Sequence, residues 1–63
     1  MTDFVDYVFG FYGTGGIYDM GATKDQILEA SKIRAATGDF QGDSFDRESV
    51  RDIMIDKFGL KFP

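Results

Sequence analysis

The chain has 63 residues, a formal net charge of −4, and neither cysteine nor histidine. This length suffices for a single domain, residues 1–63. The missing cysteines exclude disulfides and thiolate metal sites, and the missing histidines remove the commonest general base and zinc ligand. Because so short a chain has a marginal core, we expect association with itself or with another protein to complete the fold.

The acidic balance bears on the possible partners. Eleven acidic against seven basic side chains argue against direct binding to nucleic acid, which requires lysines and arginines at the phosphates. The same balance argues against an anionic membrane surface, and the apolar runs are too short to span a bilayer. The first residues, MTDFVD, have no basic signal-peptide region, so the sequence predicts a soluble, cytoplasmic chain.

The first segment, TDFVDYVFGFYG, fits two periodicities. As a helix it places on one face the side chains Phe4, Val8, Phe11 and Tyr12. As a strand it alternates Val5, Tyr7, Phe9 and Phe11 onto one face, and its β-branched and aromatic content favours this alternative. Thr2 as a cap and Gly13 as a terminator favour the helix, which we predict because an isolated hairpin is only marginally stable. Such a helix is apolar around most of its circumference, which makes it the best candidate for contact with another chain.

A loop rich in glycine follows, with the sequence GTGGIYDMGAT. A phosphate-binding loop has lysine and a hydroxyl residue after its second glycine, whereas Ile17 and Tyr18 follow Gly16 here. A dinucleotide-binding loop opens directly into a helix, whereas the residues IYDM intervene here. We therefore predict a turn in which Gly13 ends the first helix, and Gly15 and Gly16 allow positive φ. The chain then reverses and lays Ile17 and Met20 against the core.

The middle segment, TKDQILEASKIRAATG, predicts a helix that ends near Gly38. Thr23 and Gln26 have the spacing of a capping box. A narrow face that a second helix could approach closely is formed by Ile27, Ala30, Ser31 and Ala35. Arg34 projects into this face, and two interpretations remain open. Its stem lies along apolar surface with its head in water, or it forms an ion pair across a subunit interface.

The last segment, FDRESVRDIMIDKFGL, predicts a helix over residues 47–58. Asp46 is expected to cap its N-terminus, and Gly59 stands where a left-handed C-cap belongs. One face of this helix carries the apolar side chains Val50, Ile53, Met54 and Phe58.

The sequence shows no arrangement typical of catalysis. No histidine is present to activate a serine, and no Gly-x-Ser-x-Gly motif occurs. The acidic stretch DFQGDSFDRE lacks the ligand register of a calcium-binding loop, so we interpret it as a turn followed by a helix cap. We expect no enzyme activity, no cofactor and no metal site.

The stretches GGIYDMGATKDQI and GDSFDRESVRDIM give the chain a family likeness. The chain resembles small uncharacterised proteins encoded by tailed phages of marine cyanobacteria and related hosts. The resemblance covers most of the chain and implies a protein made in a bacterial host cytoplasm. It implies no activity and no site residues.

Together these observations predict an all-α fold of three short helices, with a glycine-rich loop between the first and second, completed by self-association. The expected function is a non-enzymatic protein-interaction module that acts on a host or phage protein. The predicted interface consists of Phe4, Val8, Phe9, Phe11, Tyr12, Ile17, Met20, Ser31 and Arg34. The alternative is an acidic decoy that occupies the nucleic-acid-binding surface of a host protein. A continuous negative face would favour the decoy, and interspersed charges would disfavour it.

Overall fold

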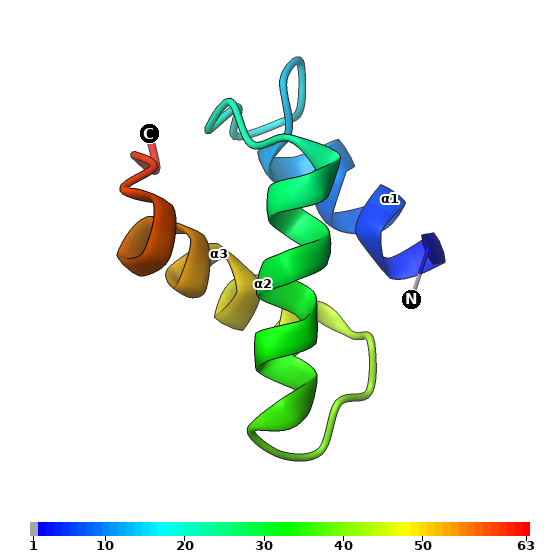
Figure 1. Ribbon diagram of the computed structural model, residues 1–63. Coiled ribbons are helices and arrows are strands. Elements are labelled where there is room, and N and C mark those ends of the chain that lie inside the picture. Colours follow the sequence, from blue (N-terminus) through cyan, green and yellow to red (C-terminus); the bar gives the residue numbers. More distant parts are fainter. Residues whose placement is uncertain (1) are drawn as a thin grey trace.

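The computed structural model describes residues 2–63 and contains three helices: α1 (Thr2–Tyr12), α2 (Lys24–Ala36) and α3 (Ser44–Phe58). The middle helix, α2, packs against both α1 and α3 (Figure 1). The predicted all-α class is confirmed, and the first segment is a helix rather than a strand. The Thr2 side chain, predicted to cap α1, lies outside the described part of the chain.

Local signals fix the ends of α2 and α3. The Thr23 hydroxyl accepts the Gln26 N–H at 3.1 Å, and the Gln26 side chain accepts the Thr23 N–H at 3.0 Å, so the predicted capping box is confirmed. Gly59 closes α3 with φ of 69°, as predicted for a left-handed C-cap. The predicted cap at Asp46 is wrong, because Asp43 caps α3 and the helix begins at Ser44.

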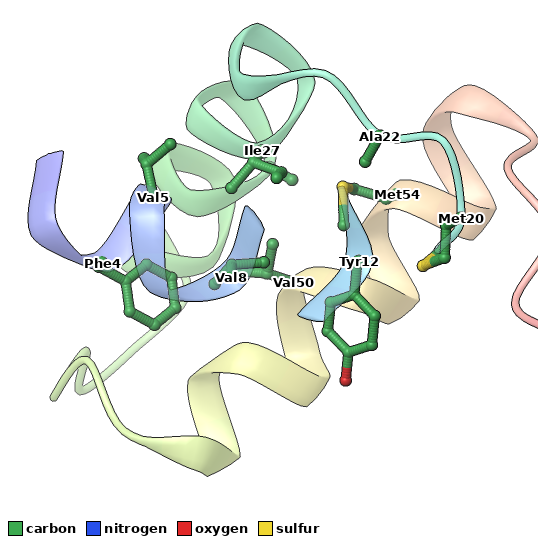
Figure 2. Close-up of a cluster of buried hydrophobic side chains, with 10 residues drawn as sticks. Phe4, Val5, Val8, Tyr12, Met20, Ala22, Ile27, Val50 and Met54 are labelled. Carbon is green, nitrogen blue, oxygen red and sulfur yellow. The ribbon is translucent and has the colours of Figure 1, made fainter. Parts of the chain in front are cut away.

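The core lies where the three helices meet the end of the glycine-rich loop (Figure 2). Its buried apolar side chains are Phe4, Val5, Val8, Tyr12, Met20, Ala22, Ile27, Ala30, Val50 and Met54. Three members of the predicted small-residue face of α2, Ile27, Ala30 and Ser31, are buried within the monomer, and the fourth, Ala35, is half-buried. The Ser31 hydroxyl donates to the Ile27 carbonyl at 2.6 Å, so burial leaves it satisfied.

The single chain is compact without a partner. Its radius of gyration is 10.1 Å, close to the value of about 10.6 Å expected for a folded chain of this length. A core of ten buried apolar side chains therefore lies within one chain, and self-association stays a prediction. The two connecting loops lie at opposite ends of α2, and the C-terminus ends beside the glycine-rich loop (Figure 1).

Candidate functional site

The glycine-rich loop, the first candidate site, is closed by its own carboxylate. Asp19 accepts the Gly15 N–H at 3.1 Å with Oδ2 and the Gly21 N–H at 2.9 Å with Oδ1. These backbone donors are the kind that would otherwise hold a phosphate oxygen. Because a side chain of the loop already occupies them, the geometry supports a turn and gives no support to a phosphate cradle.

The predicted turn is correct in part. Gly15 has a φ of 82°, as expected, whereas Gly16 does not adopt positive φ. A Cβ on Gly16 would lie 2.9 Å from the Phe11 carbonyl, so close backbone approach requires glycine there. Met20 is buried, but the prediction for Ile17 is wrong, since its side chain is 70% exposed. The Ile17 N–H donates to the Gly10 carbonyl at 3.1 Å, which folds the loop back onto the end of α1 and leaves the side chain outside.

Arg34 and Asp46, the second candidate, form an ion pair inside the monomer. Arg34 Nη2 lies 3.0 Å from Asp46 Oδ1, and the two side chains are 12% and 1% exposed. Neither interpretation of Arg34 is therefore right, because its head reaches a carboxylate of α3 in the same chain. Asp46 Oδ2 also accepts the Gln41 and Gly42 N–H groups, each at 2.7 Å. Burial raises the pKa of Asp46, but these two hydrogen bonds and the Arg34 charge outweigh it and lower the pKa.

This ion pair fastens the loop between α2 and α3. Arg34 also donates to the Thr37 hydroxyl at 3.3 Å and to the Asp39 carbonyl at 3.2 Å. A cleft of about 280 Å³ is lined by Arg34, Asp39, Gln41, Asp43, Phe45 and Asp46. Its central charges neutralise each other, which indicates a structural role. Within residues 2–63, no group of three or more acidic side chains converges to hold a metal ion.

The third candidate is a surface of neighbouring aromatic rings between α1, α3 and the chain end. Ring centroids lie 5.4 Å apart for Tyr7 and Phe11, 6.3 Å for Phe11 and Tyr18, and 5.6 Å for Tyr18 and Phe62. Tyr7, Tyr18 and Phe62 remain 38%, 45% and 39% exposed, and Phe11 is half-buried. Large aromatic side chains that stay this open in a compact monomer are candidates for contact with a partner.

Two arginines of α3 cover this row of rings. The Arg47 guanidinium lies 3.9 Å from the Phe11 ring centroid and donates to the Tyr7 hydroxyl at 2.8 Å. Arg51 lies 4.9 Å from the Phe62 ring centroid. Both are distances at which a cation is attracted to the face of an aromatic ring. We call this surface the aromatic–arginine face; it consists of Tyr7, Phe11, Tyr18, Phe62, Arg47 and Arg51.

The predicted interface overlaps this face only at Phe11. Five predicted contacts are buried in the monomer and cannot touch a second chain while the fold is intact: Phe4, Val8, Tyr12, Met20 and Ser31. Arg34 is held by Asp46, and Phe9 is half-buried with the Lys24 ammonium 5.3 Å from its ring centroid. Ile17 alone among the nine is largely exposed.

Sequence reasoning missed five members of the face: Tyr7, Tyr18, Phe62, Arg47 and Arg51. Tyr7 and Phe11 are four residues apart, as are Arg47 and Arg51, so each pair lies on one side of its helix. This spacing indicates, from the sequence alone, that the two members of each pair share one side of a helix. No periodicity indicates Tyr18 or Phe62, because a loop and the chain end bring them to the helices.

Many of the acidic side chains have partners within the chain. Five of the eleven acids take part in ion pairs, namely Asp6, Glu29, Asp46, Glu48 and Asp52. Asp19 and Asp43 are engaged with backbone N–H groups. This distribution gives the acidic-decoy hypothesis no support, because that hypothesis requires carboxylates arrayed over one continuous face.

Comparison of the chain with protein-family models, curated proteins and solved structures finds no match. Among the helices of residues 2–63, none has the length and apolar character needed to cross a membrane.

Proposed function

We propose that this chain is a non-enzymatic protein-interaction module that self-associates through the aromatic–arginine face. The observation that carries the proposal is the row of rings from Tyr7 to Phe62, covered by two arginines. Tyrosine, phenylalanine and arginine are enriched at the centres of protein interfaces, where they contribute most of the binding energy. Ile55 is also exposed and follows Arg51 by one helical turn, which extends the apolar surface.

A second copy of the chain is the proposed occupant of the face. Arg47 is followed by Glu48, with Nη2 and Oε2 3.8 Å apart, and Arg51 is followed by Asp52, with Nη2 and Oδ1 2.9 Å apart. Each copy therefore offers both signs of charge along the edge of the face. A two-fold interface needs such self-complementarity, because the same surface meets itself.

The resemblance to phage proteins supports a second element of the proposal. The self-associated module would then act on a phage or host protein rather than on a small molecule.

Sedimentation velocity on the whole chain tests the self-association. We expect the weight-average mass to rise with concentration between about 10 µM and about 1 mM, the range in which small interfaces associate. Tyr18→Glu places a charge within the row of rings and is expected to keep the chain monomeric. Phe45→Glu is the matched control, because Phe45 is 68% exposed but lies outside the aromatic–arginine face.

Two results would contradict the proposal. The first is a wild-type chain that remains a monomer at the highest concentration. The second is an association that Phe45→Glu abolishes and Tyr18→Glu leaves intact. Circular dichroism on both variants checks that each substitution leaves the helical fold in place.

A further inference from the structure

A groove runs between α2 and α3, and its lining includes Asp52, the carboxylate paired with Arg51 of the aromatic–arginine face. It has a volume of about 460 Å³ and is lined by Ile33, Asp52, Ile53, Asp56 and Lys57. Ile33 and Ile53 are both half-buried, so each leaves apolar surface open in the groove. Carboxylates and one ammonium group surround this apolar surface.

The charge around the groove is negative. Asp52 and Asp56 are four residues apart and therefore lie one above the other on α3. Asp56 takes part in none of the ion pairs or side-chain hydrogen bonds found in residues 2–63. The positive charge of Lys57 is offset by Glu29 of α2, whose Oε2 lies 3.9 Å from the Lys57 Nζ. One carboxylate therefore remains without a counterion beside an open apolar surface.

We propose that this groove binds a cationic amphipathic segment of another protein. A lysine or arginine side chain fits both features, because its aliphatic stem can cover Ile33 and Ile53 while its head reaches Asp56. Basic amphipathic helices commonly dock in this way, with an apolar face in a groove and cations on acidic rims.

The charges of the chain indicate that this occupant is not a second copy. Five of its seven cations already form ion pairs within the monomer: Lys24, Arg34, Arg47, Arg51 and Lys57. Only Lys32 and Lys61 remain outside the ion pairs of residues 2–63. A self-contact would therefore bring mostly acidic surface to an acidic groove, whereas a basic partner supplies the missing charge.

Titration with a defined peptide tests the groove. The probe is a short peptide of leucine and lysine at helical spacing, and its counterpart carries glutamate in place of every lysine. Amide ¹H–¹⁵N shifts of the Tyr18→Glu variant report binding, so that self-association through the aromatic–arginine face does not interfere. We expect saturable shifts centred on Ile33, Ile53, Asp56 and Lys57 with the lysine peptide, and none with the glutamate peptide.

Matched charge reversals separate a built site from general attraction. Asp56→Lys and Asp3→Lys change the net charge equally, and both positions are exposed. We expect Asp56→Lys to weaken binding roughly tenfold, as for reversal of a contacting charge, and Asp3→Lys to change it less than about twofold, since distant exposed charges are screened. Equal weakening by both variants, shifts without saturation, or shifts centred outside the groove would overturn the proposal. These outcomes leave the proposed self-association unaffected, because it is measured on the wild-type chain without peptide.

Discussion

Asp19 joins the two ends of the glycine-rich loop, since its carboxylate binds the Gly15 N–H at 3.1 Å and the Gly21 N–H at 2.9 Å. A single side chain thus satisfies donors on both sides of the turn. The loop also folds onto α1, where the Tyr12 carbonyl accepts the Met20 N–H at 3.0 Å. Hydrogen bonds within the loop and to α1 therefore fix the shape of the loop. The loop in turn holds Tyr18 in the aromatic–arginine face.

Removal of the Asp19 carboxylate should loosen this loop. We expect Asp19→Ala to lower the free energy of unfolding by about 1 kcal/mol, a typical net value for lost hydrogen bonds at an accessible site. Asp19→Asn, which keeps one acceptor oxygen, should lose less. Urea denaturation followed by circular dichroism measures both. An Asp19→Ala variant as stable as the wild type would show that the carboxylate does not hold the loop.

Two glycines should respond oppositely to alanine. Gly10 lies inside α1, and an added Cβ would meet nothing within 4 Å beyond the nearby backbone of its own helix and its chain neighbours, so Gly10→Ala should stabilise the chain by about 0.5–1 kcal/mol. A Cβ on Gly16 would press on the Phe11 carbonyl at 2.9 Å, so Gly16→Ala should destabilise it by about 1–3 kcal/mol. Thermal melting compares the two variants. Shifts of the same sign would contradict the described path of the loop.

The buried Asp46 should make stability depend on acid pH. Its folded-state pKa lies below the ordinary value of 3.8. As the pH falls, the Asp46 carboxylate is therefore protonated in the unfolded chain before it is protonated in the folded chain. The contribution of the group is therefore complete above the unfolded pKa and is lost as the pH falls through the folded pKa. Melting temperatures between about pH 6 and pH 2 should fall less steeply for Asp46→Asn than for the wild type.

Asp56→Asn serves as the control for this acid dependence, because Asp56 is exposed and stands apart from the described ion pairs. It should keep the wild-type slope. If Asp46→Asn also kept that slope, the ion pair with Arg34 would not account for the acid sensitivity.

Arg47 should stabilise the contact between α1 and α3. Arg47→Met keeps the length of the side chain but removes the hydrogen bond to Tyr7 and the charge over the Phe11 ring. We expect a loss of about 1–2 kcal/mol in unfolding free energy. Lys32→Met, an exposed cation outside the described ion pairs, should stay within about 0.5 kcal/mol of the wild type. Equal effects of the two changes would argue against a specific role of Arg47.

The features that were predicted correctly depend on residues close to one another in the sequence. The capping box joins Thr23 to Gln26, and the C-cap at Gly59 depends on the last turn of α3. Asp43 and Asp46 are each suitable caps by local rules. The choice between them depends on Arg34, which draws Asp46 inward from a different helix. Local patterns cannot indicate such a contact.

The candidate surface was harder to predict for a related reason. The sequence indicates that α1 is a contact surface only on the assumption that the rest of the chain is too small to bury its apolar side chains. The folded chain covers Val8 and Tyr12 completely or nearly so, by packing α2, α3 and the loop around them. Which aromatic side chains stay exposed depends on the path of the chain end. This path places the ring centroids of Phe62 and Tyr18 5.6 Å apart.

The most direct test of self-association through the aromatic–arginine face is an isotope-filtered NOE experiment on a mixture of ¹³C-labelled and unlabelled chains. At a concentration of about 1 mM, where weak interfaces are populated, we predict intermolecular NOEs that join the rings of Tyr18 and Phe62 and the methyl groups of Ile55 between two copies. The absence of intermolecular NOEs, or their restriction to Ile17, Phe45 or the groove beside Ile33, would contradict the account.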